Sequence, residues 1–152
     1  MKKLLGIVVL SLFLNSNAYP LNFNQKLSDY LKPDMGLTST IYVLNRCTGI
    51  LTYKSIMMFK ENADVGLYYN QMSAKMMNLA SKYYSIHNNV SLDVALDVNA
   101  KRMMQLDEYY RQDANEMFLK NGMYLTGIVG ADLMFCEALH ENLKKDWLWK
   151  NF

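Results

Sequence analysis

A glutamate and a histidine lie three residues apart near the C-terminal end of the chain, at Glu137 and His140, with Glu141 directly after them. On a helix this spacing places the two side chains on one face, and carboxylate-bridged di-iron bundles use the same pair. Such sites need a second pair of this kind, but the other histidine, His87, follows Tyr84 at that spacing. We therefore expect Glu137, His140 and Glu141 to form the polar edge of a helix, without a metal or cofactor.

The chain has two cysteines, Cys47 and Cys136. In an exported protein an even pair favours a disulfide. A redox-active thiol would instead need a Cys-x-x-Cys pair or a basic group beside it. Arg46 is adjacent in sequence, but on a helix it points about 100° away from Cys47. We therefore expect a structural disulfide that closes a loop of 136 − 47 = 89 residues.

Other residue patterns that suggest chemistry have simpler explanations. Methionine doublets at 57–58, 76–77 and 103–104 are possible thioether ligands for a soft metal, but methionine also packs irregular cores well. Acidic residues such as Asp97 precede a basic residue such as Lys101 by four positions, which is typical of a solvated helix face. The chain contains no nucleophile elbow, phosphate loop or zinc-ligand cluster. These patterns favour a non-catalytic protein over an enzyme, which stays the third hypothesis after the two given below.

Residues 1–18 have the three-part order of a secretory signal. Lys2 and Lys3 form a basic start, 4–14 is an apolar run, and small residues lie three and one positions before Tyr19. The apolar run is too short to cross a bilayer, which needs about 20 residues. We expect cleavage of this segment and a periplasmic or secreted product.

Residues 19–152 are expected to form one helical domain. Loss of the signal removes two lysines and no acidic residue, which leaves 16 − 2 = 14 basic against 14 acidic side chains. A neutral chain without a Lys/Arg-rich run offers no electrostatic attraction to nucleic acid or to anionic lipid. No later stretch is long and apolar enough to span a membrane.

Apolar side chains at steps of three and four predict amphipathic helices over about 38–60, 65–86, 92–121 and 131–147. A short extra helix is expected over 24–31. Asp64 and Ser91 are the expected N-caps of the second and third helices, and Gly122 ends the third. Gly127 and Gly130 weaken helix propensity and predict a loop before the last helix. The expected core includes Ile41, Leu44, Leu51, Met72, Met76, Ile86, Leu92, Leu106, Tyr110, Leu133, either Leu139 or His140, and Leu143.

Short connections between these helices predict an all-α, antiparallel four-helix bundle. In that topology the first and last helices run side by side in opposite directions. Cys47 lies nine residues after position 38, and Cys136 lies eleven residues before position 147. The two levels differ by about 3 Å, which a disulfide spans. The disulfide is therefore also a prediction about topology.

Aromatic residues concentrate at the C-terminus, at Trp147, Trp149 and Phe152, with lysines between them. If they are exposed, they form a contact surface for a partner or a membrane. If they fold back, they cover the open end of the bundle. The tail is too short to bind a membrane strongly alone, which favours the second interpretation.

Asn45-Arg46-Cys47 early in a helix, Gly122, Asp132-Leu133 and Cys136 together resemble small exported helical proteins of marine bacteria and their phages, a group without an assigned function. The resemblance implies that Cys47 and Cys136 are the fixed framework. We expect a non-catalytic exported protein that acts by contact with a protein or envelope partner of unknown identity. The alternative is a small-molecule or metal-binding helical bundle.

Overall fold

The computed structural model describes residues 25–30 and 36–144. The expected signal peptide at 1–18 and the aromatic residues Trp147, Trp149 and Phe152 lie outside this part. The described chain is helical and contains no strand, which confirms the predicted all-α class. Its elements are the 3-10 helix η1 (Leu27–Tyr30), α2 (Leu37–Phe59), α3 (Ala63–Asn88), α4 (Leu92–Asn121) and α5 (Gly127–Leu143).

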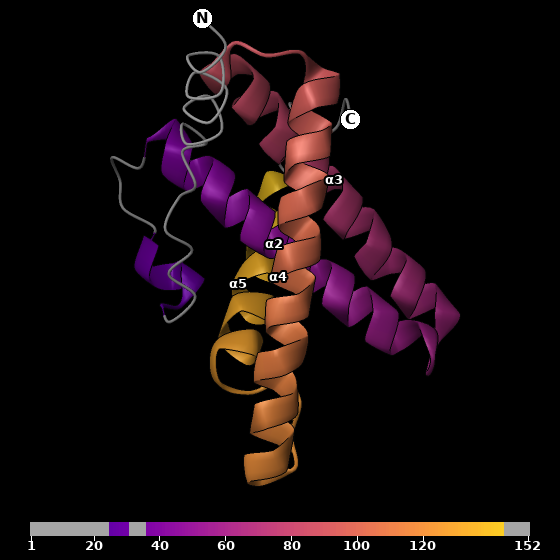
Figure 1. Cartoon of the computed structure of the whole chain (residues 1–152). Coiled ribbons are helices and arrows are strands. Elements are labelled where there is room, and N and C mark those ends of the chain that lie inside the picture. Colours follow the sequence, from indigo (N-terminus) through magenta and orange to yellow (C-terminus); the bar gives the residue numbers. More distant parts are fainter. Residues whose placement is uncertain (1–24, 31–35, 145–152) are drawn as a thin grey trace, which may run out of the picture.

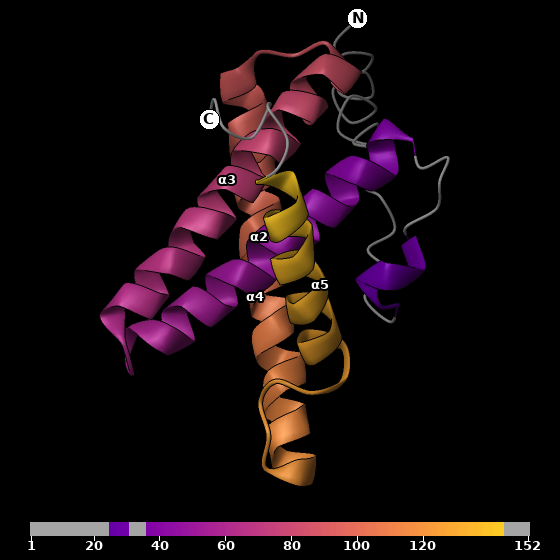
Figure 2. The ribbon, with the colours of Figure 1, turned by 180° about the vertical axis from the view of Figure 1, so that it is seen from behind.

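The four long helices form two antiparallel hairpins that cross each other (Figure 1). One hairpin is α2 with α3, and the other is α4 with α5. In Figure 1, α4 lies in front of α2, whereas in Figure 2, α5 lies in front of it. Helix α2 is therefore enclosed between α4 and α5, with α3 alongside. As a result, every residue from 41 to 51 is buried, although an amphipathic helix buries only one face.

The helix ends are set by side-chain and glycine caps. The Asn62 side chain accepts hydrogen bonds from the backbone N–H groups of Asp64 and Val65, so Asn62 is the N-cap of α3. The prediction that Asp64 is this cap was wrong, because α3 begins one residue before Asp64. Ser91 accepts from the Val94 N–H as predicted, and Gly122 ends α4 with a φ of 75°.

Helix α5 begins at Gly127 rather than near position 131, so the prediction of a loop up to Gly130 was wrong. A methyl group on Gly130 would lie 2.6 Å from the carbonyl oxygen of Leu125, so this glycine permits a tight entry into the helix. The carboxylate of Asp113 on α4 also accepts a hydrogen bond from the Val129 N–H in the first turn of α5. Tertiary contacts thus outweigh the low helix propensity of glycine.

The core follows the predicted faces except near the α3–α4 turn. Ile86 and Leu92 were expected to be buried, but they are 71% and 42% exposed. Ala95 and Asn99 are buried on the first half of α4 instead. Midway along the bundle, a methyl group on Gly49 would lie 2.6 Å from the Cβ of Leu106. The absence of a side chain at this position lets α2 and α4 approach closely.

The predicted disulfide is present. Cys47 on α2 and Cys136 on α5 are bonded, their Cα atoms lie 5.3 Å apart, and both residues are fully buried. The bond joins helices from the two different hairpins. It therefore holds the two hairpins together at the point where they cross.

Replacing Cys47→Ser tests the contribution of this bond. The chain-entropy model assigns on the order of 4 to 5 kcal/mol to a loop of this length. We expect a lower denaturant midpoint for the variant without reductant, and nearly equal midpoints for variant and wild type in excess reductant. Equal midpoints without reductant would show that the bond does not stabilise the fold.

Candidate functional site

Arg46, Tyr110 and Asp132 meet in the interior, and each is fully buried. They come from α2, α4 and α5, and we call them the Arg46 centre. The Arg46 Nη2 forms an ion pair with the Asp132 Oδ2. The Arg46 Nε donates to the Tyr110 hydroxyl at 3.1 Å, and that hydroxyl donates to the Asp132 Oδ2 at 2.7 Å. Three helices are thus joined by one closed triangle of polar contacts.

The charges of this centre follow from its surroundings. Burial by itself lowers the pKa of Arg46, but the neighbouring Tyr110 and Asp132 raise it, and the net result lies above the ordinary value. Burial raises the pKa of Tyr110 well above its usual range, although Arg46 opposes this effect. Arg46 is therefore charged, and Tyr110 keeps the proton that it donates to Asp132. Because the three residues are closed to solvent, they position helices and do not contact a substrate.

Backbone groups near η1 complete the hydrogen bonds of the Arg46 centre. The Arg46 Nη1 donates to the carbonyl oxygen of Gln25 at 2.7 Å, and the Leu27 N–H donates to the Asp132 Oδ1 at 2.9 Å. The Leu27 side chain is also fully buried. Residues 25–30 are therefore anchored to α2 and α5 through the same two charges. This anchor is the role that the structure gives to the predicted short extra helix.

A second polar chain crosses the core through α2, α4 and α3. The Asn45 Nδ2 donates to the Asn99 Oδ1 at 2.9 Å, and the Asn99 Nδ2 donates to the Ser81 Oγ at 3.0 Å. Further along α2, the Ser73 Oγ on α3 donates to the carbonyl oxygen of Thr48 at 3.0 Å. All five residues are buried. Polar pairing therefore links α2 to every long helix around it.

Reasoning from the sequence missed the Arg46 centre, although a signal exists. Arg46 is the one charged residue between Leu37 and Tyr53, and Asp132 is the one charged residue between positions 121 and 136. Two isolated opposite charges, each in an apolar segment near one cysteine, indicate a buried pair, because unpaired buried charges are too costly.

The three residues at Glu137, His140 and Glu141 do not converge. Glu137 accepts a hydrogen bond from the Tyr69 hydroxyl at 2.6 Å, and burial together with this carboxylate raises the pKa of Tyr69. Glu141 is exposed and binds the Lys144 ammonium at 2.7 Å. The described residues contain no group of three His, Cys, Asp or Glu side chains placed to hold a metal ion.

His140 is buried, only 3% exposed, and thus lies on the inner face of α5 rather than at its polar edge. Its Nδ1 lies 3.5 Å from the Glu141 carboxylate, and its ring meets the Tyr68 ring edge to face, with centroids 6.3 Å apart. A small pocket of about 100 Å³ beside it is lined by Tyr68, Gln71, Met72, Lys75, His140 and Lys144. Among the described residues, no carboxylate lines this pocket, and the Glu141 carboxylate reaches the His140 ring from outside its lining.

Large apolar side chains are exposed where α4 ends. Leu119 is 83% exposed and Met123 is 54% exposed, and the exposed rings of Phe118 and Tyr124 stack with centroids 4.2 Å apart. We call these four residues the α4 tip. Figure 1 shows that α4 extends beyond the other helices at this end. The α4 tip is therefore a projecting apolar surface.

Comparisons with protein-family models, with curated proteins and with solved structures found no match for the chain. None of the helices within 25–30 and 36–144 has the length and apolarity needed to cross a membrane. The described structure thus defines a class, a disulfide-linked all-α bundle with a buried ion pair.

Variants of the buried pair test its energetic role. Arg46→Met and Asp132→Leu each leave one buried charge without its partner, and we expect each to lower the free energy of unfolding by about 3–5 kcal/mol. The double variant is expected to lose less than the sum of the two, measured by urea denaturation. Lys101→Met removes an exposed pair with Asp97 and serves as the control, with a cost of at most about 1 kcal/mol. Additive losses in the double variant would contradict the coupling.

His140 is expected to make stability depend on pH. Burial, and next the Lys144 charge, lower its pKa below 6.5 in the folded state. Below pH 6.5 the unfolded chain therefore binds more protons than the folded chain, so stability falls as the pH falls through this window. The difference in unfolding free energy between wild type and His140→Gln should shrink or reverse from pH 7.5 to about pH 5. A constant difference across this range would contradict the assignment.

Proposed function

We propose that this protein is exported to the periplasm or the cell exterior and acts there, without catalysis, by binding another protein through the α4 tip. The single observation that carries the proposal is the exposure of four large apolar side chains within residues 118–124, at a projecting end of the molecule. Clustered apolar surface of this kind marks interaction sites, because it is otherwise a liability for a protein in water.

Export is supported by two features. The N-terminal segment has the order of a secretory signal, and Cys47 and Cys136 form a disulfide, which persists in oxidising compartments. The buried charges of the bundle are paired with one another and closed to solvent, which suits a scaffold. The scaffold then presents the α4 tip at a fixed place.

The chemistry of the α4 tip favours a protein over a lipid surface. Aromatic rings and methionine, which make up three of its four residues, are enriched in protein interfaces. Attachment to an anionic membrane gains about 1 kcal/mol per basic residue near the surface. Lys120, which lies within 118–124, is 3.6 Å from the Glu116 carboxylate, and Arg111, which lines a pocket together with Tyr124, binds Asp107, so both charges are offset. This leaves Lys60, which lines the same pocket, as the one basic residue beside the α4 tip without an ion pair in the described chain, and a single charge attracts an anionic membrane only weakly.

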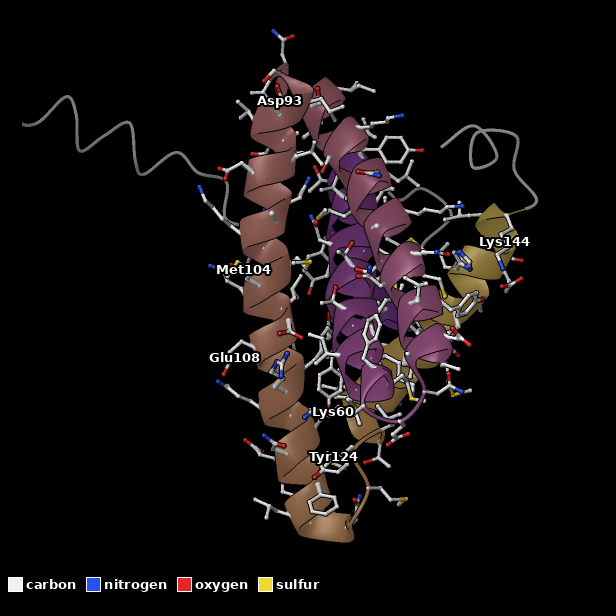
Figure 3. All side chains as sticks on the ribbon, turned by 90° about the vertical axis from the view of Figure 1, so that its right-hand side faces the viewer. Lys60, Asp93, Met104, Glu108, Tyr124 and Lys144 are labelled. Carbon is white, nitrogen blue, oxygen red and sulfur yellow. A yellow bond between two sulfur atoms is a disulfide. The ribbon has the colours of Figure 1, made fainter. Side chains whose placement is uncertain are left out.

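Site-specific photocrosslinking in cells that produce the full chain tests this function. A crosslinking residue at position 119 should give a discrete protein adduct, whereas the same residue at position 104 should not. Met104 is the matched control because it lies on the same helix, is 67% exposed and points away from the other helices (Figure 3). Adding Phe118→Glu should abolish the adduct at position 119, since it places a charge in the apolar surface.

The outcomes separate the alternatives. Adducts of equal yield at positions 119 and 104 would mean that contact is not specific to the α4 tip. Adducts only with lipid, or cosedimentation with vesicles that Leu119→Glu abolishes and Met104→Glu does not, would replace the protein partner with the envelope membrane. Export would be contradicted if the protein isolated from these cells had Cys47 and Cys136 reduced. It would also be contradicted if the adduct were found only in the cytoplasmic fraction.

A further inference from the structure

A pocket of about 310 Å³ lies where the end of α2 meets α4 and the turn after α4. Its lining residues are Tyr53, Met57, Lys60, Glu61, Arg111, Asn115 and Tyr124. Figure 3 shows Lys60 and Tyr124 close to one another on this side of the molecule. The volume is near the lower end of the range for small-molecule sites, about 300–1,000 Å³. It therefore suits a small ligand.

Several polar groups of this pocket have no partner within the described part of the chain. Tyr53 is only 6% exposed, yet its hydroxyl makes no hydrogen bond to another described residue. The Lys60 ammonium and the Asn115 side chain also lack partners there. These groups are therefore available to a ligand in the pocket. The pocket thus differs from the Arg46 centre, whose polar groups satisfy one another.

The charges favour a single negative group on the ligand. Lys60 is free to pair, and Arg111 uses its Nε to bind the Asp107 Oδ2 at 2.8 Å, which leaves its two terminal nitrogens for another acceptor. Glu61 contributes one negative charge to the lining, and Asp107 offsets the charge of Arg111, so the pocket repels a dianion. Burial raises the pKa of Tyr53, so its hydroxyl is a proton donor at neutral pH. The donors match one carboxylate better than one phosphate.

The remaining lining is apolar. Met57 offers a flexible thioether side chain, and Tyr124 offers a ring that Phe118 already holds in place by stacking. Such surfaces pack against an aromatic or aliphatic body. We infer that this pocket, the Lys60 pocket, binds a small organic monocarboxylate with an apolar body, its carboxylate on Lys60, Arg111 and the Tyr53 hydroxyl. This ligand site is additional to the protein contact proposed for the α4 tip.

Titration with phenylacetate, followed by amide chemical shifts in two-dimensional NMR, tests the inference. Phenylacetate should give saturable shifts that map to the Lys60 pocket, whereas its neutral analogue 2-phenylethanol should bind about tenfold more weakly or worse, because it lacks the charge-assisted contacts. Inorganic phosphate should give no saturable shifts there. Lys60→Gln and Tyr53→Phe should each weaken phenylacetate binding several-fold, to about tenfold for Lys60→Gln.

The controls keep the result interpretable. Lys60 is exposed and Tyr53→Phe keeps the ring, so both variants should retain the wild-type unfolding midpoint within a few degrees. Lys101→Gln, which removes an exposed lysine on α4 far from the lining residues, should leave phenylacetate binding unchanged. Absence of saturable shifts up to roughly 10 mM phenylacetate, equal binding of the neutral analogue, or tighter binding of phosphate would each overturn the inference. None of these results depends on the partner of the α4 tip.

Discussion

The buried ion pair between Arg46 and Asp132 is the constraint on which the rest of the structure depends. A charge removed from water is tolerated only when a partner and further hydrogen bonds replace the lost hydration. Here the replacements come from Tyr110 on α4 and from backbone groups of Gln25 and Leu27. Hence α2, α4, α5 and the segment around η1 must all be in place together, because the absence of any one leaves a buried polar group without its partner.

The disulfide acts on the same two helices. Arg46 precedes Cys47, and Asp132 lies one helical turn before Cys136, so the covalent bond and the ion pair are neighbours. The disulfide acts mainly on the unfolded chain, whereas the ion pair acts on the folded chain. The disulfide lowers the conformational entropy of the unfolded chain, because it holds the segments that form α2 and α5 close together. The ion pair then selects one mutual orientation of the helices, because it needs Tyr110 from a third helix at hydrogen-bond distance.

Periodicity and composition predicted much of the fold, because helix faces and paired cysteines are local or countable features. The four long helices and the disulfide were predicted, whereas the start of α5 was not, since it depends on the Asp113 carboxylate and on the tight contact at Gly130. The Arg46 centre was missed because a helical pattern assigns charges to the solvent face, and α2 has no solvent face at its middle. The Lys60 pocket combines residues of α2, α4 and two turns, so no single segment contains its signal.

Polar side chains in the core of α2 and exposed apolar side chains at the end of α4 are the two features on which the proposals rest. The interior of α2 carries Asn45, Arg46 and Thr48, all joined to other helices, so the core is specific in its pairing as well as apolar. Meanwhile Leu119 and its neighbours at the α4 tip stay exposed, and the Tyr53 hydroxyl stays without a partner in the described chain. The α4 tip and the Tyr53 hydroxyl lie at the same end of the molecule, since Tyr124 belongs to the tip and lines the pocket with Tyr53. Both proposed contacts, one with a protein and one with a small carboxylate, therefore fall around Tyr124, where the α4 tip and the Lys60 pocket share a residue.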